Sequence, residues 1–328
     1  MSDGKESAVE PENLRIAVLM GGRSAEREVS LHTGQQVSQA LASLGADIVE
    51  IDAGSPDFIH RLEDSGADVC FIALHGRYGE DGTVQGLLEL LDMPYVGSGV
   101  LASAAAMDKV ISKHLFAHAG IASPDYIVLH IGDARDAESI TAQLGPKTVV
   151  KPANEGSAIG VTIAHTPEEL PAAIEEAFRY DEVVLVERFV PGVEVTVAVL
   201  GTREPFALPT LEVVPEHEFY DYDSKYVPGM SRHIIPARVS EAAREECQRL
   251  SIEAHRLLGC RGMSRADTIV TEDGEVYLLE TNTIPGMTST SLLPDAARAA
   301  GIEFPDLCLR LVMWALEDSS ASDVGSAR

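Results

Sequence analysis

The sequence predicts an α/β protein built from more than one packed unit, the first of which is an open, mainly parallel sheet. Short apolar strands alternate with helical patterns in the first hundred residues, which is typical of such sheets. Glycine-rich segments directly follow two of these strands. The chain has 328 residues, 45% of them hydrophobic. This length exceeds what one hydrophobic core usually serves, so two or three units are expected.

The first unit is expected over residues 14–97. A buried strand at 14–20 leads into the segment GGRSAEREVS, and the next helix carries apolar residues at helical spacing until Gly45. Strands follow at 47–51 and 69–74, the second leading into HGRYGEDG and another helix. Ligands of open α/β sheets bind beyond the carboxyl ends of the strands, so both glycine-rich segments are expected near a ligand.

Two further units are expected, over 98–186 and 187–317. The first should contain a helix at 107–118, strands at 126–129 and 148–151, and a second helix at 168–180. The second should contain strands at 193–200 and 208–214, an irregular loop at 215–235, a helix before Gly259 and a final hairpin. Structureless loops of this length are commonly lids or disordered, and the aromatic run FYDYDSKY argues against disorder.

Composition limits the classes of partner. The chain carries 25 Lys and Arg against 52 Asp and Glu, a net charge of −27, which disfavours nucleic acid and anionic membranes. No apolar stretch resembles a signal peptide or a membrane span. Four separated cysteines with apolar neighbours favour a reducing, cytoplasmic setting. The polar ends, 1–13 and 318–328, are expected to be disordered tails.

A hairpin is predicted in SRADTIVTEDGEVYLLETN, because apolar residues alternate on both sides of an Asp-Gly pair. A two-residue loop would place Asp267 opposite Glu280 and Arg265 opposite Asn282, all on one face. Opposed carboxylates repel unless a cation lies between them, and ligands that are all oxygen suit Mg²⁺. The alternative is an exposed face with its carboxylates in water, and a three-residue loop would shift the register.

A phosphate site is indicated by KPANEGSAIGV, which follows a strand. Gly156, Gly160 and Ser157 would let backbone N–H groups approach phosphate oxygens. Lys151 and Lys109 could add positive charge. The alternatives are an ordinary glycine-serine turn and solvated surface lysines.

These motifs together resemble a known family. GGRSAEREVS, HGRYGEDG, VGSGVLASAAAMDK, KPANEGSAIG, FYDYDSKY, SRAD and LLETNTIPGMTSTSLLP look, in this order, like the D-alanine:D-alanine ligases of the ATP-grasp superfamily, from about Leu14 to Trp314. The resemblance implies three α/β domains with ATP held between the central and C-terminal ones. It also implies formation of D-alanyl-D-alanine, for peptidoglycan, through a D-alanyl phosphate.

By resemblance, three residues hold magnesium: Asp267, Glu280 and Asn282. Glu280 would bridge two ions, and Mn²⁺ is an expected substitute. Arg265 would stabilise the acyl phosphate and the tetrahedral oxyanion, with a backbone N–H from Gly286.

The resemblance also implies roles in binding D-alanine. Glu26 would receive the ammonium of the first D-alanine, with Ser157 and His75 nearby, and Ser291 would receive the carboxylate of the second. Simpler explanations stay open: a helix-dipole contact for Glu26, a satisfied loop histidine for His75 and an N-cap for Ser291.

Further roles concern the nucleotide and the lid. Lys109, Lys151 and Lys225 would contact the phosphates with the loop residues Gly156 and Ser157. Glu187 and Glu194 would contact adenine and ribose, unless they only form a polar strand face. Tyr226 would close the lid over Ser157 and Glu26, or simply pack in its loop. The intact DYDSKY run favours an amine as the second nucleophile.

Two other functions stay open at this point. An ATP-grasp enzyme of this kind could use D-lactate or D-serine as the acyl acceptor, or it could join a different pair of amino acids. A regulatory homologue without turnover should lack one of the hairpin residues, all of which are present. A homodimer is expected by analogy.

Overall fold

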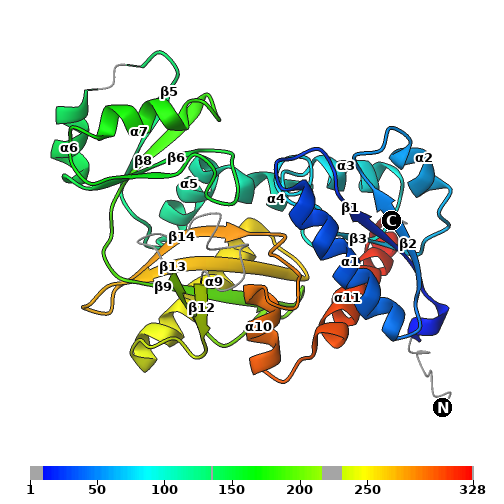
Figure 1. Cartoon of the computed structure of the whole chain (residues 1–328). Helices are drawn as coiled ribbons and strands as arrows, with labels where there is room; N and C mark the ends of the chain where they lie inside the picture. The colour runs from blue at the N-terminus through cyan, green and yellow to red at the C-terminus, as the bar shows by residue number, and fades with distance from the viewer. Residues whose placement is uncertain (1–9, 134–135, 216–230, 327–328) are drawn as a thin grey trace.

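The computed structural model describes residues 10–133, 136–215 and 231–326. Three sheets, each with its own helices, make up the described part of the molecule (Figure 1). The α/β class predicted from the sequence is confirmed. No helix among the described residues is both long and apolar enough to cross a membrane. The four cysteines are buried and unbonded, as expected.

The N-terminal sheet is parallel, with the strand order β2-β1-β3-β4. Residues 16–19 of β1 are completely buried, as in a parallel strand covered on both faces. The strands are β1 (Arg15–Met20), β2 (Asp47–Asp52), β3 (Val69–Ile72) and β4 (Tyr95–Val96). The helices are α1 (Arg27–Ser43), α2 (Phe58–Glu63) and α3 (Thr83–Leu90).

The central sheet is antiparallel, with the order β5-β8-β6-β7, and it has a hydrophobic core of its own. Its strands are β5 (Tyr126–His130), β6 (Thr148–Pro152), β7 (Thr162–Ala164) and β8 (Val183–Arg188). Helices α6 (Ala137–Leu144) and α7 (Leu170–Ala177) supply buried residues to that core. In Figure 1 this unit stands at the upper left, over the C-terminal sheet.

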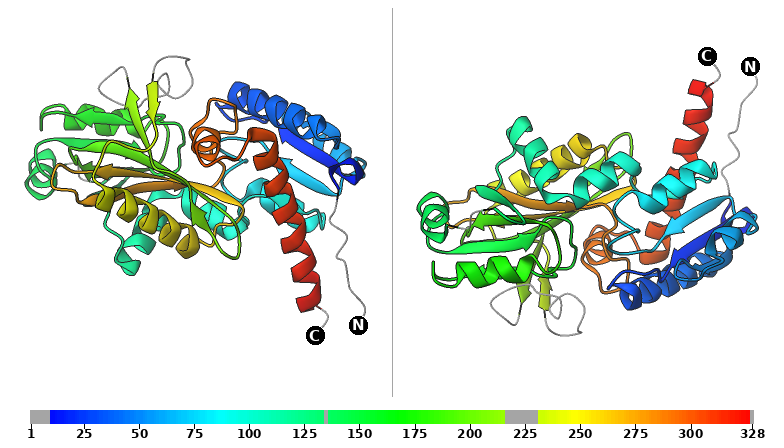
Figure 2. Two further views of the ribbon diagram at one scale, coloured as in Figure 1. Left: turned by 90° about the horizontal axis from the view of Figure 1, so that it is seen from below. Right: turned by 90° about the horizontal axis from the view of Figure 1, so that it is seen from above.

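The C-terminal sheet has the order β12-β11-β9-β13-β14, with β10 also pairing with β9. Its strands are β9 (Val193–Leu200), β10 (Phe206–Ala207), β11 (Leu211–Pro215), β12 (Ser231–Ile234), β13 (Met263–Val270) and β14 (Val276–Asn282). Helix α9 (Glu241–Leu258) packs on it together with α4 (Val100–Met107) and α5 (Lys109–Ala119). Helices α10 (Leu292–Ala299) and α11 (Phe304–Ser326) return to the N-terminal unit, where α11 packs against α1 (Figures 1 and 2).

Two hydrophobic cores contain residues from more than one of the predicted units, 14–97, 98–186 and 187–317. This division stays a prediction. Phe116 of α5 belongs to the core that lies under the C-terminal sheet. Leu307 of α11 belongs to the core of the N-terminal unit. Helices therefore cross from one unit to the next, and the sheets mark the units more clearly than the sequence ranges do.

Four local predictions were wrong. The predicted helix at 107–118 begins only at Lys109, because Asp108 has an extended backbone and its side chain caps α5. The irregular stretch 215–235 ends in the strand β12, paired with β11, while 216–230 lie outside the described residues. A 3₁₀ turn occupies Pro11–Asn13 of the expected N-terminal tail. Helix α11 continues to Ser326, since extending a formed helix costs far less than starting one.

Two helical glycines allow a matched test of packing. A Cβ at Gly34 in α1 would lie 2.5 Å from the Cβ of Met20, whereas one at Gly86 in α3 would meet nothing closer than 4.0 Å. We expect Gly34→Ala to destabilise the protein by about 1–3 kcal/mol. Gly86→Ala should stabilise it by about 0.5–1 kcal/mol. Urea unfolding measures both changes, and equal effects would contradict the packing argument.

Candidate functional site

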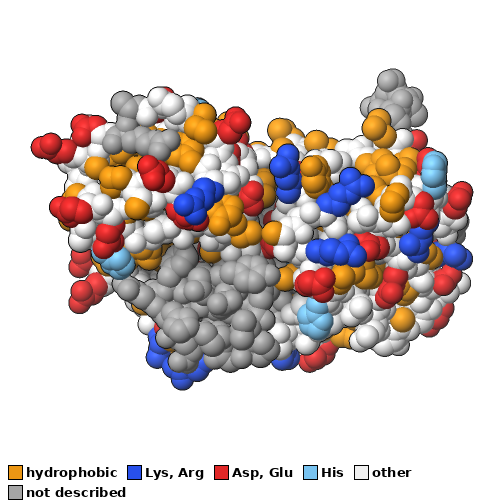
Figure 3. Space-filling view, turned by 45° about the horizontal axis from the view of Figure 1, so that its top comes forward, with side chains coloured by type: hydrophobic (Ala, Val, Ile, Leu, Met, Phe, Trp, Pro, Cys, Tyr) orange, Lys and Arg blue, Asp and Glu red, His pale blue; other side chains and the backbone are white. Residues whose placement is uncertain are grey.

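A cavity of about 400 Å³ is bounded by residues of the central sheet, the C-terminal sheet and the glycine loop. Both predicted phosphate lysines, Lys109 and Lys151, line it. So do the following predicted site residues: Gly156, Ser157, Glu187, Glu194, Asp267 and Glu280. Elsewhere on the visible surface, acidic side chains are scattered over both lobes (Figure 3). The lysines are therefore cations placed at a cavity in an acidic protein.

Glu187, at the end of β8, lies between two lysines. Its Oε2 is 2.9 Å from Lys151 Nζ and its Oε1 is 2.9 Å from Lys113 Nζ. Burial favours the neutral carboxyl, but the two ammonium groups outweigh it and lower the pKa of Glu187. Glu187 is thus a carboxylate whose two oxygens both face ammonium groups.

Lys109, at the start of α5, reaches the glycine loop. Its Nζ donates a 2.5 Å hydrogen bond to the carbonyl oxygen of Glu155 and lies 4.0 Å from Glu280 Oε2. The side chain is buried although it is charged. Lys109 therefore links the loop to the end of β14, where the hairpin carboxylates lie.

The glycine loop has an unusual backbone conformation. Ser157 and Ala158 have φ values of 49° and 59°, and Gly160 has a φ of 70°. Left-handed conformations are uncommon outside glycine and turn successive N–H groups toward one side. Together with the lysines, this conformation favours a phosphate-binding loop over an ordinary turn.

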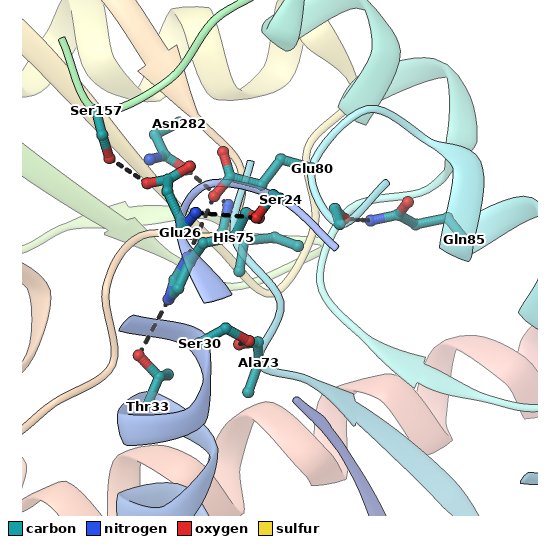
Figure 4. A network of polar contacts seen from close by, with 12 residues as sticks. Ser24, Glu26, Ser30, Thr33, Ala73, His75, Glu80, Gln85, Ser157 and Asn282 are labelled. Carbon is teal, nitrogen blue, oxygen red and sulfur yellow. Dashed lines mark hydrogen bonds and ion pairs between the residues drawn. The ribbon is translucent and has the colours of Figure 1, made fainter. Parts of the chain in front are cut away.

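Glu26 meets this loop across a long stretch of chain. Ser157 Oγ donates a hydrogen bond to Glu26 Oε1 (Figure 4). A Cβ added to Gly156 would lie 3.3 Å from the other carboxylate oxygen. Glu26 occupies the N-cap position of α1, yet its side chain makes no capping hydrogen bond. The carboxylate is therefore directed at the loop.

His75, at the end of β3, is buried and held through both ring nitrogens. Nε2 is 3.0 Å from Thr33 Oγ1, and Nδ1 is 3.2 Å from Glu80 Oε1. Its backbone carbonyl accepts a 2.7 Å hydrogen bond from Ser24 Oγ. Figure 4 shows this network beside Glu26 and Ser157. These contacts agree with the reading of His75 as a satisfied histidine, and they also fix its ring next to Glu26.

The hairpin brings the predicted residues together. Asp267 on β13 pairs with Glu280 on β14, and Arg265 pairs with Asn282, as predicted. Asp267 and Glu280 both line the cavity, and Asn282 lines a smaller space that also contains Glu280.

The register is right, but the predicted loop is not. Thr271 N donates to Glu275 O at 2.9 Å, so three residues form the loop instead of two. The extra residue shifts the pairing by one position, and a β-bulge at Leu279 shifts it back before Asp267 meets Glu280. Two departures from the expected hairpin therefore cancel.

The oxygen atoms of the hairpin residues are suitable ligands for a hard cation. Asp267 accepts hydrogen bonds from Arg265 Nε at 2.9 Å and Nη2 at 2.8 Å, and a further one from Thr196 Oγ1. A carboxylate offers about four acceptor positions, so Asp267 keeps capacity for a metal. The described residues contain no group of three His, Cys, Asp or Glu side chains placed to hold a metal. A divalent ion at the hairpin could take oxygens from Asp267, Glu280 and the amide of Asn282, a set that suits Mg²⁺.

Ser291 occupies the N-cap position of α10 without capping it. Its Oγ accepts a 3.2 Å hydrogen bond from Thr288 N and lies 2.7 Å from Thr288 Oγ1. A Cβ at Gly286 would come within 2.9 Å of the same oxygen. The hydroxyl therefore closes the turn after β14, and a glycine at 286 leaves room for it.

Some predicted residues cannot be placed, and others were missed. Lys225 and Tyr226 lie outside the described residues, as does most of the predicted lid. Lys113 was missed, although its spacing of four residues from Lys109 in MDKVISK puts both lysines on one helix face. Thr196 was also missed, because only the pairing of β9 with β13 brings it to Asp267.

Comparisons with known proteins agree with the resemblance. A family model described as the D-ala D-ala ligase C-terminus matches residues 115–313, and one for the N-terminus matches 57–98. A D-alanine–D-alanine ligase of Desulforudis audaxviator is 53% identical over 92% of this chain and 99% of its own. One of Pelotomaculum thermopropionicum is 50% identical over 93% and 98%.

Solved structures agree as well. The D-alanine–D-alanine ligase of Bacillus anthracis complexed with ATP has a TM-score of 0.82 and 34% identity, covering 94% of this chain and 99% of its own. Another crystal structure of a D-alanine–D-alanine ligase from that organism gives a TM-score of 0.84 at 36% identity, over 94% and 99%. The three-domain ATP-grasp class predicted from the sequence is therefore confirmed. On this evidence the chain belongs to the D-alanine–D-alanine ligase family.

Proposed function

We propose that the protein uses ATP to join two D-alanines into D-alanyl-D-alanine, a precursor of peptidoglycan. The observation that carries this proposal is the cavity on which a positive-φ glycine loop, two lysines and the hairpin carboxylates converge. Such an arrangement suits a polyphosphate and a hard cation held beside a reacting carboxylate. The names of the relatives support the substrate.

The reaction needs ATP because a carboxylate is a poor electrophile. Transfer of the γ-phosphoryl group to the carboxylate of one D-alanine gives an acyl phosphate and ADP. The amine of the second D-alanine then attacks the carbonyl carbon, phosphate leaves, and the amine loses a proton. Positioning and charge stabilisation supply most of the catalysis.

Each predicted residue has a proposed part in this chemistry. Arg265 and the backbone N–H of Gly286 would stabilise negative charge on the acyl phosphate and the tetrahedral oxyanion. Glu26 would bind the ammonium of the first D-alanine, which the carboxylate orientation toward Ser157 supports. Ser291 would bind the carboxylate of the second.

The nucleotide would lie in the cavity. Lys109, Lys151 and the loop at 156–157 would hold the phosphates, with Lys225 from the undescribed segment. Glu194 would face the ribose. Glu187 would contact adenine chiefly through its neighbouring backbone, since both of its carboxylate oxygens face lysines.

Asp267, Glu280 and Asn282 would hold Mg²⁺, with Mn²⁺ as a substitute. A bound divalent ion supplies charge neutralisation for the phosphates. A second ion at Glu280, a homodimer and closure by Tyr226 stay predictions from the resemblance, and a cytoplasmic location stays a prediction from the cysteines.

The test is phosphate release from ATP and Mg²⁺ with D-alanine alone, with D-alanine plus D-lactate, and with L-alanine. We expect release with D-alanine alone and a dipeptide product by mass spectrometry. If phosphate release requires D-lactate, then D-lactate is the acceptor in place of the second D-alanine. Tight ATP binding without phosphate release for any D-amino acid would contradict the proposed catalysis.

A further inference from the structure

Lys113 is a buried cation for which the proposed reaction has no part. Its side chain has 0% exposure, and it does not line the cavity. The Nζ atom lies 2.9 Å from Glu187 Oε1 and donates a 3.2 Å hydrogen bond to Ser123 Oγ. It also lies 5.4 Å from the ring centroid of Tyr126.

Burying this charge is costly, so its presence requires a reason. Desolvation lowers the pKa of Lys113, and the adjacent carboxylate of Glu187 only offsets part of that cost. Replacing a whole buried group of paired charges by apolar residues of similar volume is often neutral or stabilising. Stability alone therefore does not explain the lysine.

Lys113, Lys151 and Glu187 form a cluster whose net charge suggests why Lys113 is present. Lys113 and Lys151 each contact one oxygen of the same Glu187 carboxylate, and of these two lysines only Lys151 lines the cavity. Two ammonium groups and one carboxylate sum to a net charge of +1. Without Lys113, the carboxylate would cancel Lys151, and the cluster would present no net charge to a ligand.

We propose that Lys113 is a positioning residue for ATP: it neutralises Glu187, so that Lys151 keeps its positive charge for the nucleotide phosphates. The inference rests on the proposed function. Glu187 orients Lys151 through its Oε2, and Lys113 occupies Oε1 and prevents the carboxylate from acting as a competing anion. The role requires no contact between Lys113 and the nucleotide.

The test begins with Lys113→Met, which keeps the volume and removes the charge. We expect KM for ATP to rise about tenfold, the effect of one unit charge at roughly 10 Å with an effective dielectric constant of about 20. KM for D-alanine and kcat at saturating ATP should stay within about twofold, because the lost interaction is with bound nucleotide.

The double variant Lys113→Met with Glu187→Gln gives the decisive comparison. It removes one charge of each sign, so the cluster regains its net +1, and KM for ATP should fall below that of Lys113→Met. Measuring KM for ATP in Glu187→Gln alone completes this double-mutant cycle. Arg249→Met, on an exposed face of α9, controls for the change in total charge and should leave KM for ATP unchanged.

A purely structural role for Lys113 makes the opposite prediction. The double variant would then be no better than Lys113→Met, or KM for D-alanine would rise together with KM for ATP, and either result would overturn the proposal. An unchanged KM for ATP in Lys113→Met would do the same. Failure of the proposed function would be recognised separately, because the wild type itself would release no phosphate with D-alanine.

Discussion

Replacing Asp267 by Asn is expected to lower kcat for phosphate release with D-alanine by about 10²–10³-fold. The side chain keeps its shape but loses the charge that Arg265 contacts at 2.9 and 2.8 Å. Losing one electrostatic contact to the transition state costs about 2.7–4 kcal/mol in the activation barrier, and each 1.36 kcal/mol there is about tenfold in rate. The variant would also offer Mg²⁺ a neutral amide in place of a carboxylate.

The measurement is kcat at saturating ATP, D-alanine and Mg²⁺, together with the concentration of Mg²⁺ that gives half of the maximal rate. That concentration should rise in the variant. Glu272→Gln is the matched control, because it makes the same chemical change on the exposed loop of the same hairpin. A kcat within threefold of the wild type for Asp267→Asn would contradict the central place given to this carboxylate.

Replacing Arg265 by Lys should lower kcat by about 10²–10³-fold while KM for ATP changes less than threefold. Arginine donates to Asp267 through two nitrogens of a planar fork, and a lysine cannot reproduce that geometry. We also expect the arginine to stabilise charge that develops during the reaction, where losing one donor costs about 10²–10³ in kcat. The effect should therefore fall on kcat.

Arg249→Lys provides the control for this substitution. Arg249 makes a similar two-nitrogen contact with Glu246, at 2.7 Å for each hydrogen bond, on an exposed helix face. Its replacement should change neither kcat nor KM. If Arg265→Lys raised KM for ATP and spared kcat, Arg265 would be a residue for nucleotide binding, and its assignment to the oxyanion would be wrong.

The hairpin shows how far a sequence pattern extends. Alternating residues around an Asp-Gly pair predicted that Asp267 faces Glu280, and the structure agrees. The predicted loop was nevertheless one residue short, and the bulge at Leu279 restored the register. A bulge leaves little trace in a pattern of alternation, because its neighbours still alternate on each side.

Helix ends show a different limit. The pattern placed a helix at 107–118, and the structure begins this helix, α5, two residues later at Lys109. Asp108 is the N-cap of α5, and the preceding helix α4 was not predicted. The two helices together cover α9 and the C-terminal sheet, so the packing of the third unit decides where the chain bends.

By itself the sequence determined the α/β class, many of the strands and helices, the family and most of the candidate site residues. These depend on periodicity, turn residues and motifs, which act over a few neighbouring positions. Only the tertiary structure decided that Ser157 binds Glu26, 131 residues away, and that Lys113 shares Glu187 with Lys151. Contacts of this kind depend on how separate elements pack, and side chains distant in sequence carry no local pattern that records their meeting.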